Sequence, residues 1–400
     1  MKSHLPEDLI LLVGSNPLPN FVSVALLRPK RVHLVHSEET KTVCQRLANC
    51  LGKQLQCEVV GTEKYRIGNA SDVSEIRRIA ERLPMGCALN YTGGTKVMAA
   101  HVLDVWKHQK GGRDDWASYL DDKSDKLLFD DGTEVAIEEK VPMALTTLTD
   151  GLHGLQVKTR TPVPGGPTED DAAVVAKAVC GQVSLASQLY QHSHKSTDRG
   201  VKWKTAKEVR EQPISLASVG AELSASLIPR EGSTSAQIDV WLRFLGGDWL
   251  EDYVASLLYG VQSKAPVVEG APPNWFIHKG VTDNSRRDFE VDVVLLRGHR
   301  LYAVSCTTEA QDHHLCQSKL FEVALRARQL GGDLARFAFV CLLSRDSQGN
   351  EWADILENKI GSAWEAHFRP RVFGLRHLRE WIGTNGTNGN LSSLQEWLTQ

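Results

Sequence analysis

The run from Tyr91 to Lys96, which reads YTGGTK, combines two adjacent glycines with two threonine hydroxyls and one ammonium group. Glycines lack a Cβ atom, so the backbone can approach an anion closely, and the N-terminus of a following helix adds about half a positive charge. Thr92 and Thr95 would add hydroxyl donors. The run predicts a turn that holds the phosphate of a nucleotide-type ligand. Its spacing fits neither the P-loop nor the dinucleotide-binding pattern, and a plain tight turn is the alternative.

Acidic side chains recur in the C-terminal half of the chain. Glu251 stands beside an apolar stripe with helical spacing. In the segment DFEVDVVL at 288–295, the two-residue period of a strand puts Glu290 and Asp292 on one face, with the apolar side chains on the other. Two carboxylates on one face could bind a hard divalent ion such as Mg²⁺ or Mn²⁺ through oxygen atoms.

Strands and helices alternate over the first 150 residues. The first strand is a continuous apolar run, which suits a parallel sheet buried on both faces. The pattern predicts a doubly wound, Rossmann-like sheet with an added hairpin, and Ser37 is expected to cap the second helix. Strands are expected at 9–13, 31–35, 56–60 and 86–91, helices from 20, at 39–52, at 71–83 and from 95, and hairpin strands at 116–120 and 126–129.

The remainder of the chain divides at a segment rich in proline and glycine, 161–167, which cannot continue a helix or a central strand. A polar, partly helical stretch follows, with His192 and His194 as linker residues and a basic run from Arg199 to Lys207. A last unit shows the order helix, strand, strand, helix, strand, and a polar loop covers 384–390. We therefore expect three parts, with boundaries at 1–150, 151–235 and 236–400.

Bulk composition places the chain among soluble globular proteins. Hydrophobic residues make up 42% and charged residues 24% of the 400 residues, enough for separate cores in two or three domains. The net charge of −3 gives no general attraction to nucleic acid, so a polyanion site must be local. Eight cysteines without a CxxC pair, no export signal and no apolar run of membrane length predict a cytoplasmic protein that has no membrane partner.

Three turns, GSNP after the first strand, HSEET after the second and YTGGTK, lie on one predicted sheet edge, and over residues 7–145 they resemble the CARF domain family. CARF domains sense cyclic oligoadenylates, the second messengers of type III CRISPR systems. The resemblance implies a homodimer, because a twofold-symmetric ring is best held on the axis of an isologous interface. A ring of four adenylates is favoured. The implied ligand-binding residues are Ser15, Asn16, Ser37, Thr92, Gly93, Gly94, Thr95 and Lys96.

Residues 238–345 resemble the PD-(D/E)xK nuclease fold, and the whole chain looks like the cyclic-oligoadenylate-activated CRISPR accessory nucleases. This resemblance implies that Glu251 and Asp292 hold the metal ion. The family's second strand carries E-x-K, where this chain has Ser305 and Thr307.

Two charged residues on the next predicted helix could compensate for that replacement. Lys319 and Glu322 lie three residues apart, with Arg326 four residues further, so all three project from one side of the helix. Lys319 would stabilise charge on phosphate and Glu322 would complete the metal shell. The alternative is a solvated ladder of surface charges.

The sequence thus predicts a metal-dependent nuclease that cyclic oligoadenylate activates allosterically. Two alternatives stay open. In one, the second domain is degenerate, does not cleave, and binds nucleic acid or a protein partner. In the other, the first domain is a ring nuclease that degrades the messenger. DNA and RNA substrates are not distinguished.

Overall fold

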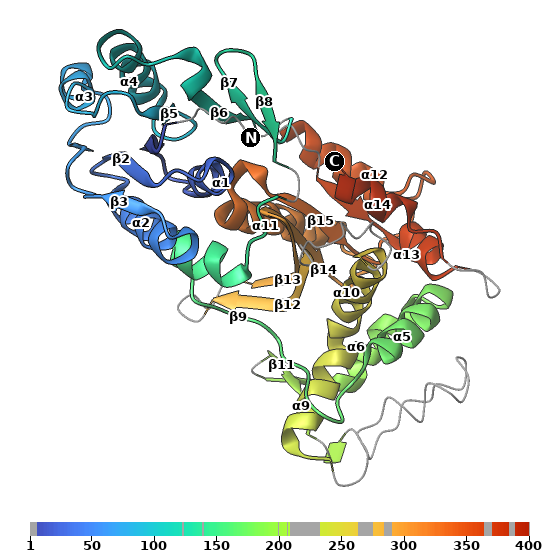
Figure 1. Ribbon diagram of the computed structural model, residues 1–400. Coiled ribbons are helices and arrows are strands. Elements are labelled where there is room, and N and C mark those ends of the chain that lie inside the picture. The colour runs from blue at the N-terminus through green and yellow to red at the C-terminus, as the bar shows by residue number, and fades with distance from the viewer. Residues whose placement is uncertain are drawn as a thin grey trace.

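The computed structural model folds into two lobes, each built around one large β-sheet (Figure 1). Four expectations fall at least partly outside the described residues: Arg199 of the basic run, positions 209–232 of the polar helical stretch, the strand start at Phe289, and most of the loop at 384–390. The described residues are 6–121, 124–137, 140–198, 200–205, 207–208, 233–262, 275–283, 290–363, 370–383 and 389–399.

The first lobe contains a mostly parallel sheet. Its strands are Asp8–Val13 (β1), Arg31–Ser37 (β2), Glu58–Val60 (β3), Arg66–Ile67 (β4), Ala88–Asn90 (β5), Ala117–Asp121 (β6), Lys126–Phe129 (β7) and Glu134–Ala136 (β8). They are ordered β3-β2-β1-β5-β6-β7-β8, and β4 pairs with β2. Pairs from β3 to β6 are parallel, whereas β6, β7 and β8 pair antiparallel. The doubly wound sheet with an added hairpin is confirmed.

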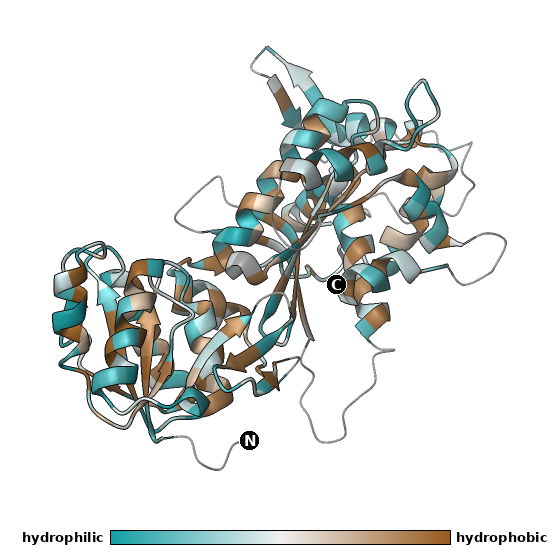
Figure 2. Ribbon diagram, turned by 90° about the horizontal axis from the view of Figure 1, so that it is seen from above, coloured by the Kyte–Doolittle hydropathy of each residue, from teal (hydrophilic) through white to brown (hydrophobic). Residues whose placement is uncertain are grey.

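Helices cover this sheet on both faces. They are Leu18–Leu27 (α1), Lys41–Leu55 (α2), Val73–Ala80 (α3) and Lys96–Gln109 (α4), and a π-helical turn, Thr147–His153 (η2), packs on α2. Because alternate residues of β1 point to opposite faces, Leu9 and Leu11 enter one hydrophobic cluster, and Ile10 and Leu12 enter another. Figure 2 shows brown strand segments inside this lobe, between helices that carry both teal and brown residues. This is the continuous apolar pattern of a strand buried on both faces.

The second lobe contains a mixed sheet with the order β16-β15-β14-β13-β12-β9. Its strands are Val157–Lys158 (β9), Trp275–Asp283 (β12), Glu290–Arg297 (β13), Arg300–Cys306 (β14), Arg336–Val340 (β15) and Arg371–Phe373 (β16). The strands β12, β13 and β14 form an antiparallel meander, and β15 is parallel to β14. The sequence pattern missed β12, because His278, Lys279 and Gly280 interrupt its apolar residues.

The helices of the second lobe are Glu169–Gly181 (α5), Ser184–Ser193 (α6), Ser235–Arg243 (α9), Trp249–Gln262 (α10), His313–Gly331 (α11), Trp352–Ala363 (α12), Leu375–Ile382 (α13) and Ser392–Thr399 (α14). A π-helical segment, Phe244–Asp248 (η3), joins α9 to α10 through a kink at Gly247. Several elements of the expected connector pack on this lobe: β9 pairs with β12, and α5 packs against α10 and α13. A separate hairpin, His194–Thr197 (β10) and Gly200–Trp203 (β11), completes the lobe.

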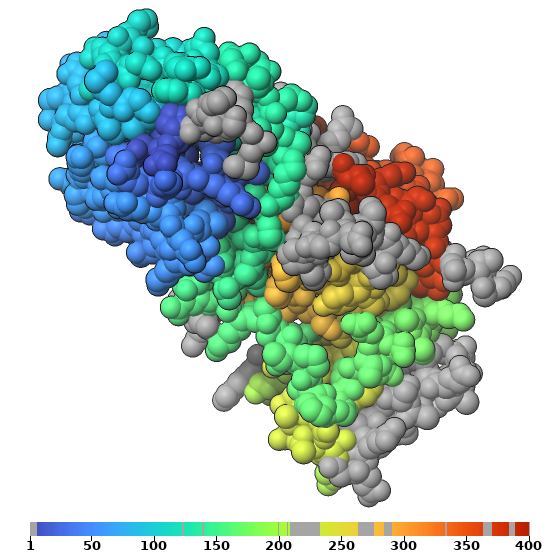
Figure 3. All heavy atoms as spheres, in the orientation of Figure 1, coloured from blue at the N-terminus to red at the C-terminus, as the bar shows by residue number. Residues whose placement is uncertain are grey.

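One hydrophobic cluster crosses from the first lobe into the second. It includes Val22 of α1 and Leu47 of α2 together with Val323 and Ala327 of α11. Figure 3 shows the green residues that follow the first sheet running along the junction of the two lobes. The lobes are therefore packed together through apolar side chains. Among the described residues, no helix is both long and apolar enough to span a membrane.

Candidate functional site

The three turns expected to bind a ligand lie side by side in the structure. β1 pairs in parallel with β2 on one side and with β5 on the other, so the carboxyl ends of these strands meet at one sheet edge. The chain order reverses between β1 and β5. In open α/β sheets, such a switch point is where ligands bind.

Glycines bring the YTGGTK turn against the end of β1. A Cβ atom at Gly93 would lie 2.1 Å from the carbonyl oxygen of Leu12, and one at Gly14 would lie 3.0 Å from the amide nitrogen of Gly94. Gly94 itself has a φ of +76°, which disfavours other residues. The turn is therefore a close approach of two backbones, and α4 begins directly after it.

The threonine hydroxyls of this turn are used within the protein. Thr92 Oγ1 accepts a hydrogen bond from the Leu120 amide at 2.7 Å, and Thr95 Oγ1 accepts one from the Met98 amide at 3.1 Å, as the N-cap of α4. Lys96 is exposed in the first turn of that helix. The threonines thus position the turn, and the backbone amides of Gly93 and Gly94 and the Lys96 ammonium are placed to meet an anion.

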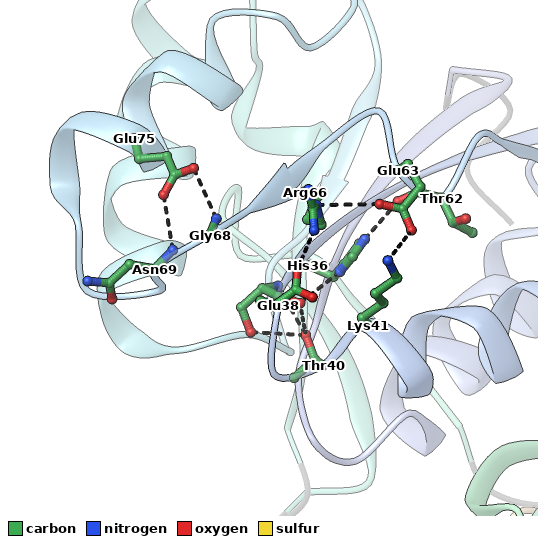
Figure 4. A network of polar contacts seen from close by, with 11 residues as sticks. His36, Glu38, Thr40, Lys41, Thr62, Glu63, Arg66, Gly68, Asn69 and Glu75 are labelled. Carbon is green, nitrogen blue, oxygen red and sulfur yellow. Dashed lines mark hydrogen bonds and ion pairs between the residues drawn. The ribbon is translucent and has the colours of Figure 1, made fainter.

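The HSEET turn after β2 is cross-linked to the loop before β4 (Figure 4). The ring nitrogens of His36 lie 2.8 Å from the Ser37 carbonyl oxygen and 2.7 Å from that of Thr62. Arg66 pairs with Glu38 and, at 3.4 Å, with Glu63. These contacts fix the backbone of the turn beside the end of β1.

Ser37 is not the helix cap that its position suggested. Helix α2 begins at Lys41 with Thr40 at the N-cap position, and no side-chain hydrogen bond caps it. The Ser37 hydroxyl lies 3.2 Å from that of Thr40, whose Oγ1 donates to the Val13 carbonyl oxygen at 3.3 Å. Thr40, which the sequence reasoning missed, therefore joins the second turn to the first.

The two polar residues after β1, Ser15 and Asn16, have different surroundings. Ser15 is exposed at the turn. Asn16 accepts a hydrogen bond from the Leu18 amide at 3.1 Å, and its Nδ2 atom would lie 1.7 Å from a Cβ atom at Gly332. Asn16 therefore packs against the residue that follows α11 in the second lobe, and it connects the ligand turns with that lobe.

Acidic residues gather in the second lobe where α10 begins. The guanidinium of Arg160 pairs with Asp248 through Nη1, and its Nη2 lies 3.1 Å from Glu251. Asp252 is 2.9 Å from Arg160 and 2.8 Å from the ammonium of Lys279. Arg160 follows β9, in the segment that the sequence marked as a connector. The sequence reasoning did not identify it, because nothing local links it to α10.

Asp292 approaches the same cluster from β13. Its Oδ2 atom accepts hydrogen bonds from the Ser305 hydroxyl at 2.9 Å and from the Cys306 amide at 2.6 Å. Ser305 therefore lies beside the carboxylate and orients it. Thr307 lies beyond the end of β14, where its amide donates to the Val340 carbonyl oxygen and its hydroxyl accepts from the Glu309 amide. The structure thus brings Ser305 to Asp292 and engages Thr307 elsewhere.

The acidic groups raise one another's proton affinity. Burial first, and then the nearby Asp292 and Asp248 carboxylates, raise the pKa of Glu251 well above its usual value, which Arg160 opposes. Burial also raises the pKa of Asp292, against the two hydrogen bonds it accepts and the charge of Lys319. Partial removal from water, Asp292 and Asp248 raise the pKa of Glu290. Carboxyls with raised pKa values in close proximity are typical of catalytic or metal-binding clusters.

Lys319 and Glu322 of α11 have different surroundings. Lys319 lies close enough to lower the proton affinity of both Asp292 and Glu290. Glu322 is exposed and pairs with Arg326 at 3.7 Å, one helical turn away. Lys319 therefore lies near the two carboxylates of β13, whereas Glu322 belongs to a surface pair.

Within the described residues, only Asp8, His33 and Cys87 bring three metal-ligating atoms within 4.8 Å of one another. Asp8 already holds Arg31 through both of its oxygens, at 2.8 and 2.7 Å, so this group is an ion-pair network at the opposite sheet edge. The carboxylates Asp248, Glu251 and Asp252 lie around Arg160, and those of β13 lie near them. Their donor set is all oxygen, which suits a hard divalent ion.

The acidic cluster lies mainly within one recognisable domain. Residues 239–351 match the Card1-like endonuclease domain family. This Card1-like region contains Glu251, Asp292, Ser305 and Lys319, so the nuclease-type second domain expected from the sequence is confirmed.

Two solved structures share the fold of the whole chain. Can2 from Sulfobacillus thermosulfidooxidans, determined in complex with cyclic tetra-adenylate, has a TM-score of 0.65 at 15% identity, over 99% of this chain and 98% of that one. Protein VC1899 from Vibrio cholerae has a TM-score of 0.65 at 14% identity, over 98% of both chains. No curated protein sequence matches the chain. The expected α/β fold, with a Rossmann-like domain ahead of the nuclease-type domain, is confirmed.

Proposed function

We propose that this chain is a nuclease of type III CRISPR defence, activated by a cyclic oligoadenylate and dependent on a divalent metal ion. The observation that carries the proposal is the half-buried acidic cluster of Glu251 and Asp292, with Lys319 near Asp292, inside the Card1-like endonuclease region. In this proposal, residues 1–150 sense the ligand, 236–400 cleave, and 151–235 connect the two.

The sensor assignment is supported by the turns at the switch point of the first sheet. The backbone of Gly93 and Gly94, the N-terminus of α4, Ser15 and Lys96 offer donors and charge to a phosphate. Can2, which shares the fold, binds cyclic tetra-adenylate, and we propose the same ring for this chain. A twofold-symmetric ring across two copies of these turns would require a homodimer.

In the nuclease centre, Glu251 and Asp292 would hold Mg²⁺ or Mn²⁺, with Glu290 as a further oxygen donor. Such an ion supplies charge stabilisation to a phosphodiester under attack and lowers the pKa of water. Ser305 and the Cys306 amide fix the orientation of Asp292. Lys319 would stabilise negative charge that develops on the phosphate, as the lysine of E-x-K does in the related fold.

A second candidate is a sensor whose second domain binds nucleic acid without cleaving it. Arg160 favours this alternative, because its guanidinium lies among the carboxylates that would hold the metal ion. The two functions differ in one respect that can be measured, namely whether phosphodiester bonds are broken.

The deciding experiment is a cleavage assay on single- and double-stranded DNA and RNA, with Mn²⁺ and cyclic tetra-adenylate. We expect cleavage by the wild type that requires both additions. Asp292→Asn and Lys319→Ala should each lower the rate by about a hundredfold or more, since both act where charge develops. Asp354→Asn, on the exposed surface of α12, is the matched control and should cleave like the wild type.

Other outcomes would reject parts of the proposal. Binding of the ring without any cleavage, with all four substrates, would favour the non-cleaving sensor. Conversion of the cyclic ligand to linear products would identify the first domain as a ring nuclease. Equal cleavage by Asp292→Asn and the wild type would exclude this centre.

A further inference from the structure

A small hairpin stands apart from the two large sheets. In the described part of the chain, β10 and β11 pair only with each other, and the hairpin packs on α6 in the second lobe (Figure 1). An isolated two-stranded hairpin is at best marginally stable in water. The hairpin is therefore held by its side chains, and the arrangement of those side chains suggests a role.

Three aromatic rings form a stack at the base of the hairpin. The His194 ring lies 4.2 Å from that of Tyr190, at 18° between planes, and 3.8 Å from that of Trp203, at 34°. His194 is thus enclosed between two rings. Trp203 keeps 43% of its surface exposed and Tyr190 keeps 41%, so the two ends of the stack are open to solvent. A flat ligand can extend the stack on Trp203.

The stack rests on the segment that leads into the acidic cluster. A Cβ atom at Gly246 would lie 2.9 Å from His194 and 2.9 Å from Trp203, so the rings fit only against a glycine. Asp248 follows two residues later and pairs with Arg160. Two residues span at most about 7 Å, which places the aromatic stack next to the proposed nuclease centre.

The hairpin is also locally basic. Residues 194–208 contain five lysines and arginines against two acidic residues, a net charge of +3 in a chain whose net charge is −3. In the pairing register, Lys195 stands directly opposite Lys202. Two like charges across a strand pair destabilise a hairpin, and Glu208 compensates Lys195, at 2.6 Å. Lys202 stays exposed, and a polyanion would remove the repulsion.

We propose that this hairpin binds single-stranded nucleic acid and delivers it to the acidic cluster. An unpaired base stacks on the open face of Trp203, and Lys202 contacts the adjacent phosphate. Aromatic platforms combined with lysines are the means by which proteins bind single strands without reading their sequence. A base pair inside a duplex offers no free face to such a ring, so the hairpin selects for unpaired segments. This inference rests on the proposed nuclease function and adds a substrate-binding element to it.

The test measures binding separately from cleavage. Fluorescein-labelled single-stranded DNA and RNA of 20 nucleotides are titrated with the Asp292→Asn protein in EDTA, and fluorescence anisotropy gives the Kd. Trp203→Ala is expected to weaken binding about tenfold, the loss of one stacked base. Lys202→Gln should reduce the slope of log Kd against log salt by about 0.7 to 1, the loss of one phosphate contact. Trp203→Phe should retain most of the affinity.

Two controls keep the interpretation specific. Lys53→Gln removes an exposed lysine from α2 of the first lobe and should leave Kd and its salt slope unchanged. Thermal unfolding of each variant shows whether the second lobe is intact. If Trp203→Ala unfolds, then the Kd and salt slope of Lys202→Gln decide the matter.

Cleavage assays separate this inference from the proposed function. In the active protein, Trp203→Ala should raise KM about tenfold at unchanged kcat. If the wild type cleaves while Trp203→Ala and Lys202→Gln match its Kd and KM, the hairpin is not a binding element, and the nuclease function stands. If the wild type neither binds nor cleaves any nucleic acid, the proposed function falls and this inference falls with it.

Discussion

Replacing Arg160 by glutamine would remove the positive charge at the centre of the acidic cluster while keeping a polar side chain of similar length. Arg160 is mostly buried and contacts Asp248, Glu251 and Asp252. Lys279 remains paired with Asp252 at 2.8 Å. Asp248 and Glu251 therefore lose the cation that pairs with them, and both stay in a region where burial disfavours their charge.

The size of the effect follows from these contacts. Removing one partner of a buried ion pair costs about 3 to 5 kcal/mol, because the other charge is left uncompensated. Since Lys279 still compensates Asp252, we expect the lower end, about 3 kcal/mol. At about 2.1 cal/mol/K of unfolding entropy per residue, that loss corresponds to a fall in Tm of roughly 4 °C for a chain of 400 residues. Arg160→Lys keeps the charge and should lose less than half as much.

The assay is urea unfolding, in EDTA, of Arg160→Gln, Glu251→Gln and the double variant. If Arg160 acts by compensating charge, neutralising Glu251 will offset part of the loss, and the double variant will be about 1 to 2 kcal/mol more stable than the sum of the single effects predicts. In a second series, with Mn²⁺ in place of EDTA, the ion should stabilise Arg160→Gln more than the wild type, because the ion can replace the guanidinium. Additivity within about 0.5 kcal/mol, with no difference in the response to Mn²⁺, would refute the reasoning.

Two further predictions concern the first lobe and the junction. Gly93→Ala should abolish binding of cyclic tetra-adenylate in calorimetry and destabilise the protein by about 1 to 3 kcal/mol, since the added Cβ would lie 2.1 Å from the Leu12 carbonyl oxygen. Gly181→Ala, where a Cβ would meet no atom within 4 Å, is the control. Burial lowers the pKa of His299 to about 3, so the unfolded chain binds its proton first and stability falls as pH drops from about 6.5 toward 3. His299→Gln should make that fall shallower by up to about 1.4 kcal/mol per pH unit in urea unfolding, and an unchanged slope would contradict the assignment.

The first lobe was largely predictable from the sequence because its strands are short apolar runs separated by turn residues. Buried parallel strands need apolar side chains on both faces, and β1 satisfies this rule from Leu9 to Val13, whereas β2 does so only at Val32, Leu34 and Val35. The adjacency of the three ligand turns also followed, since parallel strands end at one sheet edge. The hydrogen-bond partners of the threonine hydroxyls could not be predicted in the same way. Whether Thr92 faces a ligand or the amide of Leu120 depends on a strand 28 residues away.

The nuclease centre was predictable only in part, because its side chains come together from distant segments. Period and spacing placed Asp292 on β13 and Lys319 on α11. They could not place Arg160, which meets Asp252 across 92 residues of chain, or Lys279, which lies on a strand whose pattern is broken by polar residues. Their spacing put Lys319 and Glu322 on one side of α11. In the structure, Lys319 lies near the acidic cluster, whereas Glu322 is exposed.

The packing of the two lobes bears on how a ligand at the first could affect the second. Asn16, beside the ligand turns, packs on Gly332 directly after α11, and Lys319 lies 13 residues earlier on the same helix, or about 20 Å along its axis. A second contact joins the lobes at the turn between β13 and β14. There, Asp125 of the first lobe pairs with Arg300, the first residue of β14, at 2.9 Å. The elements that carry Asp292, Ser305 and Lys319 are thus each attached to the first lobe at one end. Gating then requires only that the ring favour one placement of α11 against these strands, which is a difference in binding free energy between two arrangements.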